Sequence, residues 1–219
     1  MDGLMSYPLN DRGRAYLEAR GLGDVAGSLR FGSVPASPSD EHRSYAGRLV
    51  IPSIGPRGNV YDVALRCLED HVCSETVLWT TPDDKKVTCK KYLFLPGMQK
   101  RAYNLQALAT ADRVIDITEG QLDAAALVAC GLHAIGFPGS DSWAKHHHRL
   151  FGGYELVRVW PDGDEAGSKF AQRVAGDLPN ADVMMVPSGE DVNSILVNQG
   201  KDAILKIAEG NVEDDEPPF

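Results

Sequence analysis

Three carboxylates stand just after apolar runs, where a folded chain can hold metal ligands. Glu119 follows the run RVIDIT, and Asp162 and Asp164 follow the run YELVRVW. A carboxylate at the tip of a strand is open to ligands, yet the sheet behind it holds it in place. Two carboxylates separated by one glycine can turn toward the same hard cation, and Mg²⁺ prefers oxygen ligands. The spacing therefore predicts a site for Mg²⁺ or Mn²⁺ formed by these three side chains.

Each of these motifs also has an ordinary structural explanation. Glu119 and Asp123 form an E-G-x-x-D string, which is typical of a helix start because the helix dipole favours acidic residues there. Asp162 and Asp164 could form an Asp-Gly turn in which Asp164 caps the next helix. The combination is more specific, because three neighbouring carboxylates repel one another unless a cation neutralises them.

The second half of the sequence alternates between strand-like and helical stretches. The expected strands are RVIDIT, HAIGFP, YELVRVW and ADVMMVP. The expected helices are DAAALVACG, a polar helix at about 142–150, a helix at about 165–177 and a helical pair from about residue 192. This alternation predicts an α/β fold with a four-stranded parallel, Rossmann-like sheet and flanking helices. Ligands of such sheets bind at the carboxyl ends of the strands, where the acidic residues lie.

The first half has a different pattern. A short helix is expected at 11–20, closed by Gly21, followed by a Pro/Ser-rich loop and the strand-like runs GRLVIPSI, NVYDVALRC, SETVLWTT and KYLFLP. We therefore expect a small mixed α+β subdomain over residues 1–109, the parallel-sheet domain over 110–210, and an acidic disordered tail over 211–219.

The charge distribution differs between the two halves. The formal net charge of −9 alone argues against nucleic-acid binding, because Lys and Arg make the phosphate contacts. Residues 1–109 carry a balance of +2, however, and residues 110–219 carry −11. This separation suits an enzyme whose carboxylates hold cations while the other half binds polyanions. No apolar stretch is long enough to predict a membrane helix and no leader is recognisable, so a cytoplasmic location is expected.

The cysteines exclude a disulfide scaffold. Cys67, Cys73 and Cys89 share one 23-residue stretch with His71, and Cys130 stands apart. Four zinc ligands are present in principle, but the C-x2-C spacing typical of zinc sites is not. The sequence therefore favours reduced thiols over a zinc site.

Several motifs, in the same order, resemble DnaG-type bacterial and phage DNA primases. DITEGQLDAAALVACG is similar to the first TOPRIM motif, WPDGDEAGSKFAQR to the second, and MMVPSGEDVNSIL to the segment that follows. YLEARGL, GRLVIPSIGPRGNVYDVALR and KKYLFLPGMQKRAYNL resemble the blocks of the primase RNA-polymerase domain that precede its TOPRIM fold. The resemblance covers most of residues 14–200.

This resemblance implies roles for individual residues. It gives the catalytic and metal-binding roles to Glu119, Asp162 and Asp164, with Asp123 and Asp191 as further metal ligands. It also implies a basic ridge for template and nucleotides, formed by Arg48, Arg66, Lys91, Lys100 and Arg101. Without the resemblance, solvated surface charge would be the default interpretation of these cations.

The resemblance further implies an activity and partners. The expected activity is that of a DNA-directed RNA polymerase, a nucleotidyltransferase that makes short RNA primers on single-stranded DNA from ribonucleoside triphosphates in DNA replication. The alternatives are a TOPRIM metal-dependent nuclease and a non-catalytic single-strand-binding replisome subunit. No Cys/His zinc module precedes the core and little chain follows it, so a partner chain with a zinc module or a helicase is expected.

Overall fold

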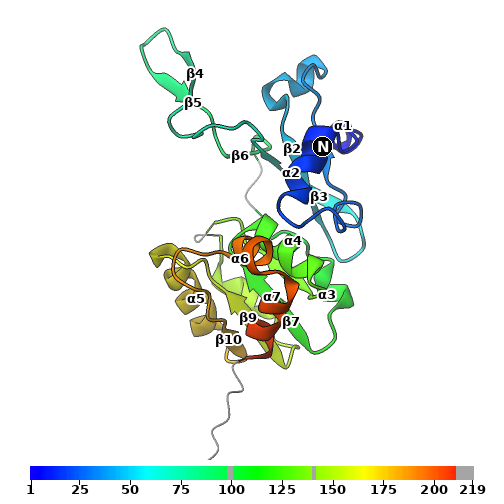
Figure 1. The fold of residues 1–219 in the computed structure, drawn as a ribbon, viewed down its shortest axis with the longest axis vertical. Coiled ribbons are helices and arrows are strands. Elements are labelled where there is room, and N and C mark those ends of the chain that lie inside the picture. Colours follow the sequence, from blue (N-terminus) through cyan, green and yellow to red (C-terminus); the bar gives the residue numbers. More distant parts are fainter. Residues whose placement is uncertain (98–100, 140–141, 211–219) are drawn as a thin grey trace, which may run out of the picture.

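The computed structural model describes residues 1–97, 101–139 and 142–210. It contains two sheets, each the centre of its own subdomain, and a separate hairpin that projects from one of them (Figure 1). The predicted tail at 211–219 lies outside the described residues.

The lower subdomain in Figure 1 is built on the predicted parallel sheet. Its strands are β7 (Val114–Thr118), β8 (Ala134–Gly136), β9 (Leu156–Trp160) and β10 (Ala181–Val183). They lie in the order β10-β9-β7-β8, and all neighbours are parallel. The chain leaves β7 toward β8 and leaves β9 toward β10, so the direction of winding reverses between β7 and β9. Such a reversal is where open α/β sheets bind ligands, and Glu119 and Asp162 follow the two strands that flank it.

Helices cover this sheet as the sequence pattern predicts. They are α4 (Gln121–Ala129), α5 (Glu165–Asp177), α6 (Val192–Gln199) and α7 (Lys201–Glu209). The polar stretch near 142–150 is the exception, because it forms a 3-10 helix, η2 (Lys145–Leu150), in place of the expected α-helix. Trp143 and Phe151 at its two ends are both buried against Phe137. A short piece anchored at both ends suits the tighter 3-10 form.

The upper subdomain is the predicted mixed α+β unit. Its antiparallel sheet has the order β1-β2-β3-β6, with β1 (Gly32–Ser33), β2 (Leu49–Ile54), β3 (Val60–Arg66) and β6 (Tyr92–Phe94). Three short helices accompany it: α1 (Asp2–Met5), α2 (Asp11–Glu18) and the 3-10 helix η1 (Asp40–Tyr45). The expected closing residue of the second helix, Gly21, has a φ of +69°, a conformation that glycine adopts without strain.

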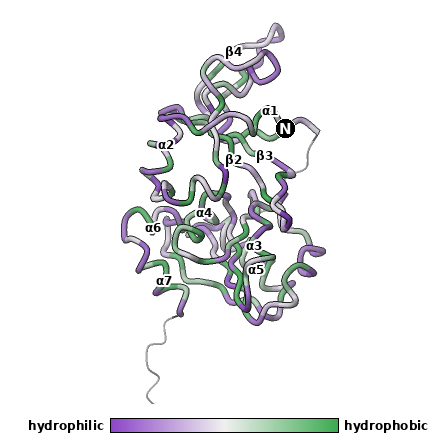
Figure 2. Tube along the Cα trace, turned by 90° about the vertical axis from the view of Figure 1, so that its right-hand side faces the viewer, coloured by the Kyte–Doolittle hydropathy of each residue, from purple (hydrophilic) through white to green (hydrophobic). Residues whose placement is uncertain are grey.

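The run SETVLWTT does not join this sheet. Its strand β4 (Val77–Thr80) pairs with β5 (Lys86–Thr88) in an isolated two-stranded hairpin. Every residue of β4 is exposed, and the hairpin stands apart from the rest of the chain in both views (Figures 1 and 2).

A shared core joins the two subdomains. One cluster of buried side chains runs from Leu17, Leu49 and Ile51 of the upper subdomain to Leu127 of α4 and Ile195 of α6. A short segment that contains α3 (Ala107–Thr110) connects them, and within it a β-bridge pairs residue 103 with residue 136 of β8. The boundary near residue 109 stays a prediction, since residues 102 and 107 already pack into the core of the parallel sheet. Within the described part of the chain, no helix is both long and apolar enough to cross a lipid bilayer.

Candidate active site

Glu119 lies at the tip of β7 with its side chain turned inward. The residue is only 8% exposed, and among the described residues its Oε1 has no hydrogen-bond partner. Burial, and then the neighbouring charge of Asp164, raise the pKa of Glu119 to about 7, although the backbone N–H of Asp162 opposes this shift. A buried carboxylate oxygen without a donor is costly unless a ligand satisfies it.

Asp162 follows β9 and faces Glu119 across the reversal point of the sheet. Burial raises the pKa of Asp162 to about 6, and the charges of Glu119, Asp191 and Asp164 add to the shift. Lys91 acts in the opposite direction and lowers this pKa. The two predicted strand-tip carboxylates therefore do meet, and each makes the other harder to ionise.

Asp123, in the first turn of α4, is buried as deeply as Glu119. Burial raises its pKa to about 7, with further contributions from Asp191 and Asp162. Its Oδ1 accepts a hydrogen bond of 3.2 Å from the backbone N–H of Asn193 in α6. Asp123 thus belongs to the same acidic cluster, which we define as Glu119, Asp123, Asp162 and Asp191.

Asp164 and Asp191 both cap helices. Asp164 is exposed and accepts a hydrogen bond of 2.8 Å from the backbone N–H of Gly167 at the start of α5. Asp191 does the same at the start of α6, accepting 2.6 Å from the backbone N–H of Ser194. Asp191 lines the cleft described below, whereas Asp164 lines a neighbouring depression together with Asp162. Asp164 therefore caps α5, its charge acts on Glu119, and its predicted role as a metal ligand stays a prediction.

Glycines permit this crowding of carboxylates. A Cβ atom on Gly120 would lie 2.1 Å from Oδ2 of Asp123. A Cβ atom on Gly167 would lie 2.1 Å from the carbonyl oxygen of Asp162, so α5 could not begin so close to that strand tip. The contact at Gly167 is with backbone and explains why glycine occupies that position, whereas at Gly120 the close atom is the end of the Asp123 side chain.

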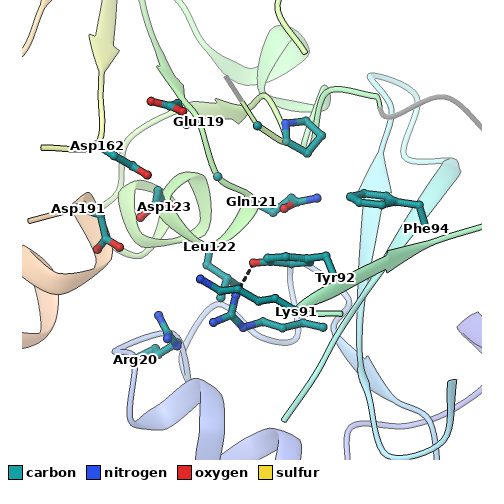
Figure 3. Close-up of a pocket in the computed structure, with 14 residues that line it drawn as sticks. Arg20, Lys91, Tyr92, Phe94, Glu119, Gln121, Leu122, Asp123, Asp162 and Asp191 are labelled. Carbon is teal, nitrogen blue, oxygen red and sulfur yellow. Dashed lines mark hydrogen bonds between the residues drawn. The ribbon is translucent and has the colours of Figure 1, made fainter. Parts of the chain in front are cut away.

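The acidic cluster forms one wall of a cleft of about 330 Å³ between the two subdomains. The opposite wall comes from the upper subdomain and includes Arg20, Lys91, Tyr92 and Phe94 (Figure 3). Carboxylates thus face cations and aromatic rings across a space open to solvent. This arrangement brings together the two halves of opposite charge that the sequence shows.

Two of the predicted ridge cations line this cleft. Lys91 is exposed, and its positive charge is near enough to Asp162 to lower the pKa of that carboxyl group. Arg66 is held between aromatic rings, 5.4 Å from that of Tyr16 and 5.0 Å from that of Tyr92, and it donates a hydrogen bond of 2.7 Å to the Tyr92 hydroxyl. Its Nε is buried without a partner in the described structure.

The other predicted cations lie elsewhere. Arg48 is 7% exposed, and its guanidinium donates 2.8 Å to the carbonyl oxygen of Lys90, so it is built into the framework. Arg101 is exposed and lines a different depression, beside Tyr61. Lys100 lies outside the described residues. Contacts of these three with template or nucleotide stay predictions.

Arg20 is a cleft residue that the sequence pattern does not reveal. Its guanidinium donates 2.7 Å to Oδ1 of Asn193 and lies 4.9 Å from the ring of Tyr16. The backbone carbonyl of Arg20 in turn accepts 2.8 Å from the Asn193 side chain. Arg20 and Asn193 are 173 positions apart, and the turn that follows α2 brings them together because it lies against α6, where Gly21 approaches the Leu196 side chain.

The donor set of the acidic cluster fits a hard divalent cation. All the side-chain donors are carboxylate oxygens, the ligand type of Mg²⁺ and Mn²⁺, and one of them is the unpartnered Glu119 Oε1. The three raised pKa values show that the surrounding protein does not compensate the negative charge. The chain contributes acid residues that only an additional positive charge would balance.

Comparison with known proteins identifies relatives of this chain. A family model described as Toprim-like matches residues 116–196. The Gene 57 protein of Mycobacterium phage D29 is 47% identical over 116 residues, which are 53% of this chain and 76% of that protein. A DNA primase of Pseudomonas putida is 34% identical over 243 aligned positions, covering 92% of this chain but only 35% of the primase. A solved DnaG primase catalytic domain bound to single-stranded DNA is similar in fold, with a TM-score of 0.71 and 22% identity over 94% of this chain and 73% of that one.

Proposed function

The chain belongs to the family of Toprim-containing, DnaG-type primase cores, and on that premise we propose that it is a DNA-directed RNA polymerase that makes short RNA primers on single-stranded DNA. The chain spans about a third of the Pseudomonas putida primase, so this activity is proposed for the core that the two subdomains form. The similarity to a phage protein supports the further proposal that it works at replicating DNA in the cytoplasm of an infected cell.

One observation carries the proposal: a single cleft joins an uncompensated acidic wall to a wall of cations and aromatic rings. Nucleotidyl transfer needs both, because a triphosphate brings negative charge that cations must balance while the nucleotides stay aligned. A purely structural cluster of acids would gain nothing from facing an open cleft.

The acidic cluster would hold the metal. Glu119, Asp123, Asp162 and Asp191 are the residues that fit Mg²⁺ or Mn²⁺, and Asp164 adds negative charge beside them. A bound divalent ion would neutralise the triphosphate and favour loss of the proton from the attacking 3′-hydroxyl. Alternatively, Glu119 could accept that proton through Oε1 in place of binding the metal, because this oxygen has no hydrogen-bond partner among the described residues.

The cationic wall would bind and orient the substrates. Lys91 and Arg20 can contact phosphate oxygens of the template or of a nucleoside triphosphate. Arg66 is a positioning residue in this proposal, since its stacking on Tyr92 fixes the ring that lines the cleft. Tyr92 and Phe94 present aromatic surface on which bases can stack without sequence preference.

A primer-synthesis assay tests the proposal. The protein would be incubated with single-stranded template, labelled ribonucleotides and Mg²⁺ or Mn²⁺, with and without candidate zinc-module or helicase partners. We expect template-dependent RNA products that fall by about 100-fold or more in Asp162→Asn, a loss of the size seen when a transition-state contact is removed. Asp202→Asn, an exposed acid of α7, is the matched control and should keep full synthesis.

Two results would contradict the proposal in different ways. Metal-dependent cleavage of nucleic acid with no synthesis under any condition would identify a nuclease. Single-strand binding with neither synthesis nor cleavage, and without a change in Asp162→Asn, would identify a non-catalytic subunit.

A further inference from the structure

The structure brings together the four cysteine and histidine residues that could bind zinc, although their spacing in sequence argues against a zinc site. The ligand atoms of Cys67, His71, Cys73 and Cys89 all lie within 4.8 Å of one another. Cys67 follows β3 and Cys89 precedes β6, so the antiparallel pairing of these strands places the two thiols side by side. His71 and Cys73 come from the loop that leads into the hairpin. We propose a structural Zn²⁺ site at the base of the β4–β5 hairpin, with four ligands: Cys67, His71, Cys73 and Cys89.

Two of the distances between ligand atoms match tetrahedral coordination, and the other ligand atoms lie within 4.8 Å. The sulfur atoms of Cys67 and Cys89 are 3.7 Å apart, and the sulfur of Cys67 is 3.7 Å from Nε2 of His71. Four ligands at the usual zinc distances would be separated by roughly 3.6–3.8 Å along each edge of a tetrahedron. A disulfide would need the two sulfur atoms about 2.05 Å apart. The distance of 3.7 Å between the two sulfur atoms therefore fits one metal ion bound between them better than a disulfide bond.

The chemistry of the donors separates this site from the acidic cluster. Three thiols and one imidazole are soft and borderline ligands, which select Zn²⁺ over Mg²⁺. Three thiolates around one Zn²⁺ leave a net charge of −1, and Nη2 of the buried Arg48 lies 3.6 Å from the Cys89 sulfur, where its charge balances the excess. This contact gives Arg48 a role in the framework, because outer donors to metal-bound sulfur orient it and adjust its charge.

The β4–β5 hairpin lacks the apolar packing that would otherwise hold it to the rest of the protein. Among the described residues, the hydrophobic core clusters include none from 69 to 91. Val72, Leu78 and Trp79 are between 51% and 57% exposed. An isolated two-stranded hairpin is marginally stable in water, so a segment without apolar packing requires another link to the fold. A metal bound by ligands from both of its ends supplies that link.

The proposed site also adjoins the cleft. The backbone N–H of Cys67 donates 2.9 Å to the carbonyl of Lys91, and Arg66 precedes Cys67 directly. Both cations line the cleft. Zinc at this position would therefore hold the bases of two side chains on the cationic wall, although the binding of zinc does not depend on the proposed primase activity.

Metal analysis of the full chain tests the inference. Protein purified without chelators should contain about one zinc per chain by elemental mass spectrometry, and Cys73→Ser should lose it. Cys130→Ser is the matched control, because Cys130 lies outside the group, and Asp162→Asn should also keep its zinc. Circular dichroism should show that Cys73→Ser retains the folded core, since the hairpin packs against none of it.

A second measurement needs no variant. Replacement of zinc by Co²⁺ in the wild-type protein should produce the absorption band of thiolate bound to cobalt, and chelation should speed proteolysis within residues 72–88. Wild-type protein that takes up neither zinc nor cobalt through thiolates would overturn the inference, as would a Cys73→Ser protein with unchanged zinc content. An intact mass that shows a disulfide between Cys67 and Cys89 in freshly purified protein would also overturn it.

Discussion

Glu119, Asp123 and Asp162 are held in the cleft where their negative charge is unfavourable. Burial is the largest cause of the raised pKa of Glu119, Asp123 and Asp162, and the acids then raise one another. A purely structural site would replace such groups with amides or apolar residues at little loss. At the scale of single residues, the protein is therefore arranged to gain stability from a cation.

The raised pKa of Asp123 predicts a pH dependence of stability. The folded-state pKa is about 7 and the unfolded value is near 4, so the folded protein binds the extra proton and stability is lost as pH rises through this window. In EDTA, Asp123→Asn should gain roughly 2–3 kcal/mol relative to wild type between pH 5 and pH 8. Denaturant titrations at the two pH values measure this, and saturating Mg²⁺ should remove the wild-type loss.

Asp202→Asn provides the reference for this experiment, because Asp202 is exposed on α7. Its stability relative to wild type should be the same at both pH values. If the stability of Asp123→Asn relative to wild type were also the same at both pH values, the pKa of Asp123 would not be raised in the folded protein.

Gly120 offers a test that leaves the acids themselves unchanged. In Gly120→Ala the new Cβ would lie 2.1 Å from Oδ2 of Asp123, the end of a side chain that can rotate away. We expect the fold to survive and Mn²⁺ affinity to fall by about tenfold or more, equivalent to about 1.4 kcal/mol. Isothermal titration would measure the affinity.

The control for this change is Gly176→Ala in α5, where a Cβ meets nothing within 4 Å. It should leave metal binding intact and raise stability by about 1 kcal/mol, since alanine is the better helix former. Equal metal affinity in the two alanine variants would show that the close contact at Gly120 does not position the acidic cluster.

At the scale of elements, a buried ion pair fixes β7 beside β9. Asp116 is fully buried and accepts 2.8 Å from Nε and 2.9 Å from Nη2 of Arg158, and 2.7 Å from Nε1 of Trp160. Arg158 also donates 3.0 Å to the carbonyl of Ala208 in α7. The network sets the relation between the two strands whose tips carry Glu119 and Asp162.

Removal of one partner should therefore be severe. Asp116→Ala leaves the Arg158 guanidinium buried without its counter-charge, and we expect a loss of about 3–5 kcal/mol in the free energy of unfolding. The exposed pair Arg113–Glu155 joins the starts of the same two strands, so Glu155→Ala is a matched control that should cost less than about 1 kcal/mol. Urea unfolding would compare them, and similar losses would show that the buried network does not fix the strands.

The elements that sequence could predict are those with a clear periodicity. The four parallel strands and the helix at 165–177 follow from apolar runs and turn residues, because burial dictates those patterns. The 3-10 form of 145–150 and the separate pairing of β4 with β5 could not be predicted, since they depend on contacts with distant residues. For the same reason the sequence disfavoured a zinc site: the four candidate ligands come together through the pairing of β3 with β6, and they have no short spacing in sequence.

At the scale of the whole molecule, the cleft exists only because the two subdomains pack together. The sequence shows halves of opposite charge balance, which predicts a division of roles but not which cations face the acids. Arg20 reaches the cleft through its contact with Asn193, which no local pattern indicates. Arg48 is the opposite case. The sequence predicts it as a residue of the basic ridge, but its side chain is buried and bonded to the carbonyl of Lys90.

Lys91 provides a test of the cationic wall. If it contacts a phosphate of single-stranded DNA, Lys91→Ala should weaken binding and reduce the slope of log K against log salt concentration by about 0.7. Lys145→Ala, an exposed cation of η2 outside the cleft, should change neither. Fluorescence anisotropy at several salt concentrations would decide it, and identical salt slopes for wild type and Lys91→Ala would exclude a phosphate contact.

The most direct test of the account is a titration of Mn²⁺ into the purified protein, followed by the loss of the free-ion signal in electron paramagnetic resonance. The acidic cluster should bind Mn²⁺ in wild type and in Cys73→Ser, which alters only the proposed zinc site. Binding should be strongly weakened in Asp162→Asn and unchanged in Asp202→Asn. Equal Mn²⁺ binding by wild type and Asp162→Asn would contradict the account, because the cleft would then not be the metal site.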